Sequence, residues 1–555
     1  MTSAVEATST LLGEVRHLVG GGGRPVRRAL LGLGALAVLA GVVLRFWAPT
    51  PLWLDEALSV NISRLPLARI PHALSHDGSP PLYYLLLHFW MVPFGQGDHA
   101  VRALSGVVSV ISLPFFWMAG RRLGGRTTAW IVLFLAATSP FAINYATSAR
   151  MYSLMILWTV LGYLALVRAV EEPSRRRLVA LSAVTAALLY THYWGLYLVA
   201  ATGGWLAYRI WRGSREGVDA PELRGVRPAF GAVVTGNVLW LPCAPLFVYQ
   251  LLHTGTPWTS AAGPADLLRV FGDFAGTGPW GLLLTFLFFG LFVIGIFGRQ
   301  VGRVPDLGEV PDLGVVRAED RRSADRVARE GVLLTFRPTP TATPLLAVLI
   351  GTLAVAVVLG AAAHAAFVAR YTAVVLPLFL LVVAIGIAAL GSRRAIAAVL
   401  AVACLAGVLT ARGENVSQRS EAGRVAKVLN AQAQPGDLVV YCPDQLGPAV
   451  DRLLRVRHLD QLTFPRAAGP DLVNWVDYKS VVARTNVGNF AQTLLGGLGA
   501  GHTLWLVWRD GYPGLGGDCG YLRSWLDMLR PTGQVLVKQS SSAYYEYENL
   551  VRYPS

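Results

Sequence analysis

The amino-acid sequence predicts a polytopic α-helical membrane protein with a C-terminal α/β domain, and three observations support this class. Only 15% of the 555 residues are charged and the mean hydropathy is +0.48, whereas a soluble protein of this length carries far more charge. Several apolar runs reach the ~20 residues that span a bilayer. The apolar runs shorten after residue 411, where all the lysines lie, which indicates a water-facing domain.

The net charge of +15 is interpreted as a membrane-topology signal. Almost all of it comes from arginine, and a GC-rich genome is the preferred interpretation of that bias. Arginines beside apolar runs mark the cytoplasmic side of a membrane. Arg24, Arg27 and Arg28 precede the first run, so the N-terminal tail, residues 1–28, is expected in the cytoplasm. No nucleic-acid module, phosphate-binding loop or serine nucleophile motif occurs in a suitable context, and no nucleic-acid partner is expected.

Residues 29–411 are predicted to form a membrane domain with about 11 spans. The count depends on residues 80–95, which are short, aromatic and interrupted by Pro93. If this segment crossed the membrane, the arginines after residue 119 would lie outside, against the positive-inside rule. We therefore expect it to be a helix in the outer interface. The predicted spans are 29–47, 101–119, 127–143, 152–170, 178–192, 195–210, 228–249, 279–298, 344–363, 371–390 and 395–411.

Three regions are predicted to lie outside the spans. Residues 48–100 form an outer loop that carries an acidic pair and the interfacial helix. Residues 299–343 are charged and repeat the motif Pro-Asp-Leu-Gly, which is typical of a flexible cytoplasmic loop. Residues 412–555 form an extracytoplasmic α/β domain of ordinary size. Its predicted strands are 437–442, 503–508, 534–538 and 544–550, and its predicted helices are 446–454 and 521–529.

The four cysteines fall into two groups. Cys243 and Cys404 lie in apolar spans and are expected to be packing residues. Cys442 and Cys519 lie in the C-terminal domain, match no metal motif and are able to pair in an oxidising compartment. The sequence leaves that pairing open.

Asp55 and Glu56 are the first candidates for catalysis. They follow the first span directly, within Pro-Leu-Trp-Leu-Asp-Glu-Ala-Leu-Ser at 51–59, and a charge so close to hydrocarbon is costly. A carboxylate at such a place takes a proton from an incoming hydroxyl when it acts as a general base. Glu56 would share this role, orient Asp55 or raise its pKa. The structural alternative is that acidic residues stabilise the first turn of a helix.

Outer arginines are candidate ligands for an anion. Arg150 and Arg370 each precede a predicted span on its outer side, against the usual bias of positive charge. A guanidinium binds phosphate oxygens in a bidentate way. Snorkelling to the interface is the alternative, and it is the preferred interpretation of Arg102.

Histidines gather at the same predicted face, but their spacing fits no metal motif. A divalent metal is therefore not indicated, and no cofactor is predicted. His192 ends one span beside Tyr193 and Trp194, and it is a candidate for lining a sugar pocket. An aromatic belt at the interface is the alternative interpretation, and the preferred one for Trp194.

Five motifs resemble the polytopic glycosyltransferases of the GT-C fold. The closest group is the family 39 type, which includes the protein O-mannosyltransferases and the bacterial lipid A aminoarabinose transferase. The resemblance covers about residues 29–390 and depends on the order of the motifs and on their common outer face. The motifs are Trp53-Leu54-Asp55-Glu56-Ala57, Pro80-Pro81-Leu82-Tyr83-Tyr84, Ala149-Arg150-Met151-Tyr152, Thr191-His192-Tyr193 and Arg370-Tyr371.

The resemblance implies an inverting transfer of a sugar, mannose or similar, from a polyprenyl-phosphate donor. The acceptor would be a protein, glycan or lipid outside the cytoplasm, and Asp55 would be the general base with Glu56 beside it. Outer arginines and aromatic residues hold the lipid phosphate in that family. The implied phosphate ligands are Arg150, Tyr152, Arg370 and Tyr371.

The implied sugar or acceptor pocket departs from the family at one point. Relatives often carry a lysine or histidine just before Pro-Pro-Leu-Tyr, whereas this chain has Ser79 there, with His76 and Asp77 nearby. The pocket is expected to consist of His76, Asp77, Tyr83 and His192.

Two other classes of function stay open. A transporter or flippase for a lipid-linked saccharide would carry polar residues at mid-membrane depth, whereas the predicted spans are nearly free of them apart from Asn237 and His364. A membrane-anchored binding protein would use residues 412–555 and would not depend on Asp55.

Overall fold

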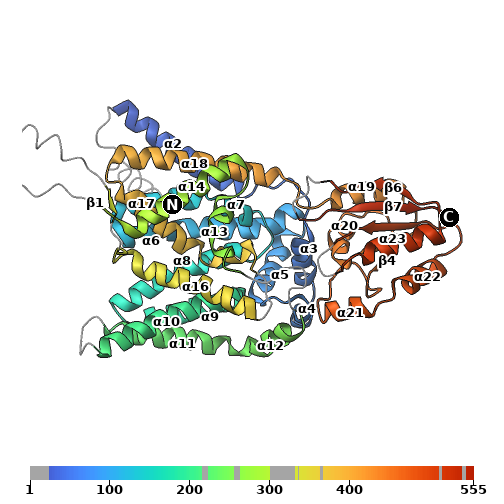
Figure 1. Ribbon diagram of the computed structural model, residues 1–555, viewed down its shortest axis with the longest axis horizontal. Helices are drawn as coiled ribbons and strands as arrows, with labels where there is room; N and C mark the ends of the chain where they lie inside the picture. The colour runs from blue at the N-terminus through green and yellow to red at the C-terminus, as the bar shows by residue number, and fades with distance from the viewer. Residues whose placement is uncertain are drawn as a thin grey trace, which may run out of the picture.

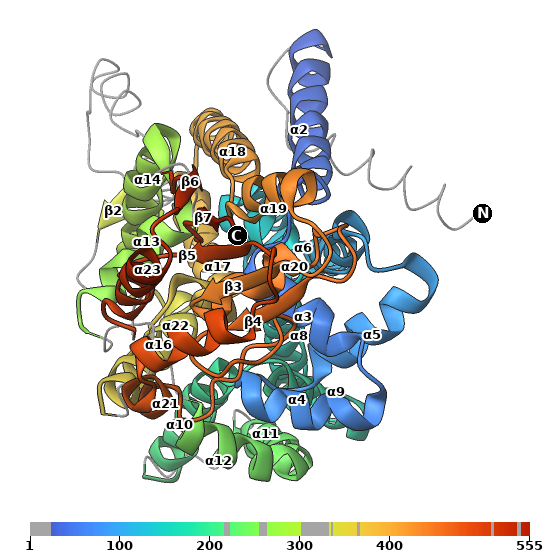
Figure 2. The ribbon, with the colours of Figure 1, turned by 90° about the vertical axis from the view of Figure 1, so that its right-hand side faces the viewer.

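The computed structural model describes residues 24–215, 223–254, 263–300, 332–334, 337–362, 367–511, 515–540 and 545–555. The molecule is elongated, with a helix bundle at one end and the C-terminal α/β domain at the other (Figure 1). Seen from the side of that domain, the sheet lies over the end of the bundle (Figure 2). The two parts meet at the short helices α3 (Leu54–Ser63) and α4 (Ile70–Asp77).

Helices occupy every segment that the sequence predicts to span the membrane. The helices at these positions are α2 (Arg24–Leu44), α6 (Asp98–Thr138), α8 (Tyr152–Glu171), α9 (Arg175–Thr191), α10 (Trp194–Arg215), α11 (Val226–Trp240), α12 (Ala244–His253), α14 (Gly278–Phe297), α16 (Ala342–Ala362), α17 (Leu376–Ala389) and α18 (Arg393–Val416).

Among the described residues, six helices are long and apolar enough to cross a bilayer. The protein is therefore a multi-pass membrane protein, whereas the count of about 11 spans stays a prediction. The six are Asp98–Thr138, Tyr152–Glu171, Val226–His253, Gly278–Phe297, Ala342–Ala362 and Arg393–Val416.

Helix α6 bends within its length. Its backbone is not helical at Gly124 and Gly125, and Gly125 has a φ of +76°, a left-handed conformation that favours glycine. The bend separates the two segments that the sequence predicts as spans 101–119 and 127–143. It allows both halves of α6 to pack against neighbouring helices.

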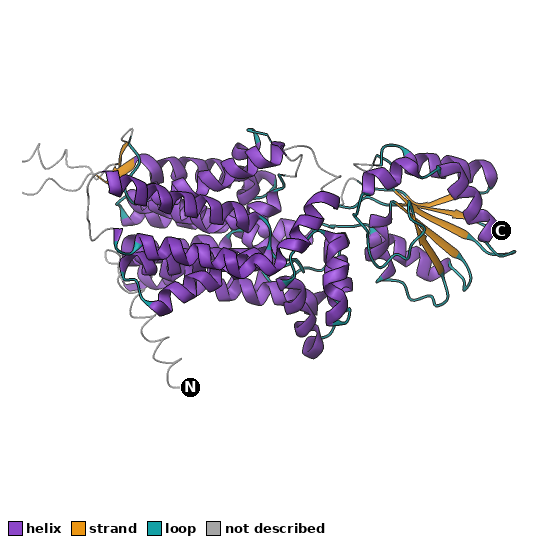
Figure 3. Cartoon of the chain, turned by 90° about the horizontal axis from the view of Figure 1, so that it is seen from below, coloured by secondary structure: helices purple, strands orange, loops and turns teal. Residues whose placement is uncertain are grey.

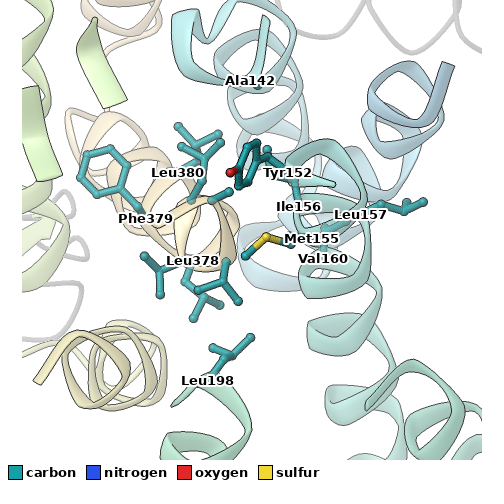
Figure 4. Close-up of a cluster of buried hydrophobic side chains, with 14 of the residues drawn as sticks. Ala142, Tyr152, Met155, Ile156, Leu157, Val160, Leu198, Leu378, Phe379 and Leu380 are labelled. Carbon is teal, nitrogen blue, oxygen red and sulfur yellow. The ribbon is translucent and has the colours of Figure 1, made fainter. Parts of the chain in front are cut away.

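Helix α17 lies at the centre of the bundle. Its residues Leu376–Ala384 are all buried, as expected for a helix that is apolar on every side. It packs against α14 and α6, and Leu378, Phe379 and Leu380 belong to the buried cluster that includes Tyr152 and Met155 of α8 (Figure 4). The core is therefore continuous from α17 to the first turn of α8.

A helix also forms within the segment predicted for the interface. Helix α5 (Leu82–Phe94) follows α4 and exposes Phe89, Val92 and Phe94. Exposed apolar side chains suit a helix that lies against lipid. Its position relative to the membrane stays a prediction.

The C-terminal domain contains a sheet of five strands in the order β4-β3-β5-β7-β6. Strand β3 is parallel to β4 and β5, and β7 is antiparallel to β5 and β6. The strands are β3 (Leu438–Cys442), β4 (Asp460–Thr463), β5 (Leu504–Trp508), β6 (Gln534–Val537) and β7 (Asn549–Tyr553).

Helices cover both faces of this sheet (Figure 3). Leu438 and Val440 point into one apolar cluster, and Val439 and Tyr441 into the other, because successive side chains of a strand alternate between faces. Both faces are buried, so β3 and β5 consist almost wholly of apolar residues. The helices are α19 (Ala422–Gln432), α20 (Gly447–Asp451), α21 (Tyr478–Arg484), α22 (Val487–Gly497) and α23 (Asp518–Leu529).

Most of the predicted elements of this domain are present. The strands predicted at 437–442, 503–508 and 534–538 correspond to β3, β5 and β6. The last strand begins at Asn549, later than the predicted 544, because Tyr545 and Glu546 contact Trp53 and Leu54 at the helix bundle instead of joining the sheet. Strand β4 was not predicted, since Asp460-Gln-Leu-Thr lacks an apolar run.

Cys442 and Cys519 form a disulfide that joins the end of β3 to α23. Cys243 and Cys404 are free and buried, as expected for packing residues. At the opposite end of the molecule, β1 (Gly298–Gln300) pairs with β2 (Val332–Leu334). The rest of the predicted loop at 301–331 and the tail at 1–23 lie outside the described residues.

Candidate active site

The acidic pair lies in the first turn of α3, where the helix bundle meets the C-terminal domain. Pro49 and Pro51 keep the chain from α2 extended until Trp53. Carboxylates are favourable at a helix N-terminus because of the helix dipole. Successive residues of a helix point about 100° apart, so Asp55 and Glu56 face different surroundings.

Glu56 is fully buried and clamped by Arg102 of α6. Arg102 donates from Nε to Oε1 (2.8 Å) and from Nη2 to Oε2 (2.6 Å), and the Ala149 N–H donates to Oε1 at 2.9 Å. Burial alone would raise the pKa of Glu56, but the charge and hydrogen bonds of Arg102 outweigh it and leave the pKa below its usual range. Glu56 is therefore ionised and joins α3 to α6 and to the loop before α8.

Asp55 keeps access to solvent and faces two guanidinium groups. Its Oδ2 atom lies 3.7 Å from Arg370 Nη2 and 4.0 Å from Arg150 Nε. These are ion-pair distances and are too long for hydrogen bonds. The side chain is 17% exposed, in contrast to Glu56.

Arg150 is held between α7 (Pro140–Ala146) and α8. Its Nη1 atom donates to the Asp55 carbonyl (3.3 Å), to Ser59 Oγ (3.1 Å) and to the Tyr84 hydroxyl (3.3 Å). Tyr84 in turn donates to Asp77 Oδ2 at 2.6 Å, and burial raises the pKa of Asp77. Asp77 thus belongs to a chain of hydrogen bonds that ends at Arg150.

Arg370 lies in the short helix η4 (Ala369–Val374), just before α17. Its guanidinium is 5.7 Å from the Trp53 ring centroid and 5.6 Å from that of Tyr371, within the range of cation–π attraction. Within the described residues, three buried donor atoms near Asp55 have no hydrogen-bond partner: Arg150 Nε, Arg370 Nε and the Tyr152 hydroxyl.

Aromatic rings extend the site away from Asp55. The centroid of the His192 ring lies 4.8 Å from the ring centroid of Tyr371 and 6.1 Å from that of Tyr152. The Nδ1 atom of His192 accepts the Trp194 N–H at 3.1 Å, so the neutral ring carries its proton on Nε2.

Two predicted pocket residues lie in other surroundings. Tyr83 is 2% exposed, and its hydroxyl contacts Ser105 Oγ at 3.1 Å. The His76 ring lies 4.8 Å from His72, and the His76 carbonyl accepts the Trp475 N–H of the C-terminal domain at 3.0 Å. Burial and the charge of His72 lower the pKa of His76.

The C-terminal domain contacts the start of α3 directly. The Tyr545 ring stacks on Trp53 with centroids 4.2 Å apart. The Leu54 N–H, one residue before Asp55, donates to Glu546 Oε2 at 3.1 Å. This domain is therefore in contact with the backbone that positions Asp55.

Arg102, Arg419 and Glu546 are the residues that sequence reasoning missed. The sequence favours snorkelling for Arg102, but the side chain is 4% exposed and pairs with Glu56. Arg419 binds the carbonyl of Thr147 (2.9 Å) and lies 3.6 Å from Glu56. Arg419 follows a span that is predicted to end on the outer side. An arginine beside the outer end of a span is the same pattern that identified Arg150. No local signal marks Glu546.

Comparison with known proteins supports a fold assignment. Residues 78–218 match the family model of dolichyl-phosphate-mannose-protein mannosyltransferases, which is less than half of the chain. A search of curated proteins finds no match. The crystal structure of ArnT from Cupriavidus metallidurans bound to undecaprenyl phosphate has a TM-score of 0.54 and 13% identity, and covers 95% of this chain and 98% of that chain. The apo structure of the same protein has a TM-score of 0.56 with the same identity and coverage.

The chain has the GT-C fold. The Archaeoglobus fulgidus oligosaccharyltransferase is also similar, with a TM-score of 0.45 and 11% identity over 93% of this chain and 72% of that chain. In this GT-C protein the site combines a partly exposed carboxylate with two buried guanidinium groups. Such a set is able to accept a proton and to neutralise an anion at one place.

Proposed function

We propose that this GT-C protein is a glycosyltransferase that moves a sugar, mannose or similar, from a polyprenyl-phosphate carrier to a protein, glycan or lipid acceptor outside the cytoplasm. One observation carries the proposal: Asp55 lies between Arg150 and Arg370, and both arginines keep a buried Nε donor without a hydrogen-bond partner among the described residues. A buried donor without a partner is costly, and an anionic ligand would satisfy it.

The arginines would hold the phosphate of the donor. Each guanidinium has further donors beyond those that contact Asp55, and Tyr152 offers a hydroxyl beside them. Negative charge grows on the phosphate oxygens as the sugar leaves, so fixed positive charges stabilise the transition state more than the ground state. The structural relative ArnT binds undecaprenyl phosphate, which supports this assignment.

Asp55 would act as the general base. The acceptor hydroxyl gives its proton to the Asp55 carboxylate while its oxygen forms a bond to the anomeric carbon. The bond from that carbon to the carrier phosphate breaks, and polyprenyl phosphate leaves with the electron pair. A single displacement inverts the anomeric centre. The exposure of Asp55 and its loose ion pairs leave the carboxylate free to meet a hydroxyl.

The other predicted site residues take supporting roles in this proposal. Glu56 orients α3 through its pair with Arg102. Tyr371 and His192 form an aromatic wall beside Arg370. Asp77 and Tyr84 hold Arg150 in place. His76 would line the acceptor side, close to the C-terminal domain, whereas Tyr83 is buried and its hydroxyl contacts Ser105 of α6.

The proposed orientation places the C-terminal domain outside the cytoplasm and the N-terminus inside. The disulfide Cys442–Cys519 supports it, because disulfides persist in oxidising compartments.

The test uses purified protein in nanodiscs with a panel of polyprenyl-phosphate sugars and candidate acceptors. We expect release of free polyprenyl phosphate from one donor, and at least a 100-fold lower rate for Asp55→Asn, since loss of a general base costs about 10²–10⁴-fold. Asp471→Asn is the matched control, because Asp471 is 54% exposed and pairs with Arg64. Equal rates for wild type and Asp55→Asn would refute the role of Asp55. Donor binding without release in the folded protein would favour a transporter or a binding protein.

A further inference from the structure

A short segment of the C-terminal domain, Tyr545–Glu548, is bonded to the link between α18 and α19 and contacts the start of α3 through Tyr545 and Glu546. The N–H groups of Tyr545 and Glu546 both donate to the Arg419 carbonyl at 3.0 Å. The Glu421 N–H donates to the Glu546 carbonyl at 3.2 Å. Because Arg419 also binds the loop before α8, the segment is anchored to the same structure that carries Arg150.

Two side chains of this segment reach the first turn of α3. Tyr545 stacks on Trp53 with an angle of 19° between the rings. Glu546 Oε2 accepts the Leu54 N–H at 3.1 Å. The first N–H groups of a helix have no partner inside the helix, so Glu546 supplies the acceptor that the Leu54 amide otherwise lacks. Asp55 is the next residue.

Glu546 is an unusual residue for a buried contact. It is 4% exposed, and its other oxygen, Oε1, has no hydrogen-bond partner among the described residues. A buried carboxyl group destabilises a fold unless its contacts compensate. Its neighbour Glu548 is also buried, but it accepts from Ser420 Oγ of the C-terminal domain at 3.2 Å instead of from an amide of α3.

We propose that Glu546 is a positioning residue for Asp55, so that the C-terminal domain completes the catalytic centre instead of serving only to bind an acceptor. This inference rests on the proposed function, since it takes Asp55 as the base. The Leu54 amide and the Trp53 ring are fixed from the C-terminal domain, and the Asp55 carboxylate is thereby held near Arg150 and Arg370.

The experiment compares Glu546→Ala, Glu546→Gln and Glu548→Ala in the full-length protein. Glu546→Ala removes the acceptor for Leu54, and we expect kcat to fall about 10- to 100-fold, as for other small misplacements of a reacting group. The donor KM should change less than about twofold, because Arg150 and Arg370 keep their own contacts. Glu546→Gln keeps a side-chain oxygen for the Leu54 N–H, and its kcat should return to within about threefold of wild type. Glu548→Ala should keep the wild-type kcat.

A second readout does not depend on activity. Hydrogen–deuterium exchange of the peptide that contains residues 53–58 should be faster in Glu546→Ala than in wild type, and unchanged in Glu548→Ala. If exchange is faster in Glu546→Ala but not in Glu548→Ala, the inference is supported even if no donor in the panel is turned over.

Three results would overturn the inference. One is a wild-type kcat for Glu546→Ala in an enzyme whose turnover depends on Asp55. Another is an equal loss of kcat in Glu548→Ala, which would mean that only the general stability of the segment matters. The third is unchanged exchange of residues 53–58 in Glu546→Ala. If turnover by the wild type does not depend on Asp55, the proposed function is refuted. The exchange experiment would then test only whether Glu546 holds residues 53–58.

Discussion

At the scale of single residues, the adjacent carboxylates of α3 have opposite surroundings. Glu56 is enclosed and has a bidentate arginine partner, whereas Asp55 is partly exposed and has only loose ion pairs. A buried ion pair adds little net stability compared with apolar packing, but loss of one partner leaves an uncompensated charge. Glu56 therefore acts as an anchor for the helix on which Asp55 is presented.

Arg102→Ala tests this anchor. We expect a loss of about 3–5 kcal/mol in the free energy of unfolding, because Glu56 would be left buried and unpaired. Chemical unfolding in detergent measures the change. Arg64→Ala removes an exposed pair with Asp471 and should change stability by less than about 1 kcal/mol. Similar losses in the two variants would contradict the role of Glu56 as an anchor.

At the scale of secondary-structure elements, α14 and α17 touch backbone to backbone. A Cβ atom on Gly386 would lie 1.9 Å from the Leu291 carbonyl oxygen, and one on Gly295 would lie 2.2 Å from that of Val382. Small residues allow such close helix packing in membranes. The contact matters for the site because α17 follows directly on η4, which carries Arg370.

Gly386→Ala should force these helices apart. We expect a loss of about 1–3 kcal/mol, the usual cost of overpacking, together with reduced donor turnover because Arg370 would shift. Gly290→Ala is the control on α14, since a Cβ there would meet no atom within 4 Å. Thermal unfolding of both variants in one detergent is the measurement, and equal melting temperatures would show that the helices adjust without cost.

At the scale of the whole molecule, the two parts meet through buried acidic groups. Burial raises the pKa of Glu546 to about 8, and nearby Asp55 adds to the shift while Ser420, the Leu54 amide and Arg509 oppose it. Burial and the charges of Glu546 and Glu421 also raise the pKa of Glu548. The junction therefore holds more protons in the folded protein than in the unfolded chain.

The stability of the protein should consequently fall as the pH rises. An unfolded glutamate has a pKa of about 4.3. The contribution of Glu546 to the free energy of unfolding is therefore fully present below that pH, and it is lost as the pH rises through about 8. Glu546→Gln does not titrate, and its melting temperature should vary less than that of wild type between pH 5 and 8. If the melting temperatures of the two proteins change with pH in the same way, Glu546 has an ordinary pKa.

The sequence determined the helical segments, the central strands of the C-terminal domain and the three residues Asp55, Arg150 and Arg370 that the structure brings together. Each of these depends on local features: the length of apolar runs, the alternation of side chains and the placement of charge beside a span. Only the tertiary structure decided the partners of these residues. Arg102 is 46 positions from Glu56, and Glu546 is 492 positions from Leu54. No local pattern encodes such pairs, because a buried charge selects its partner only when packing has removed water from both.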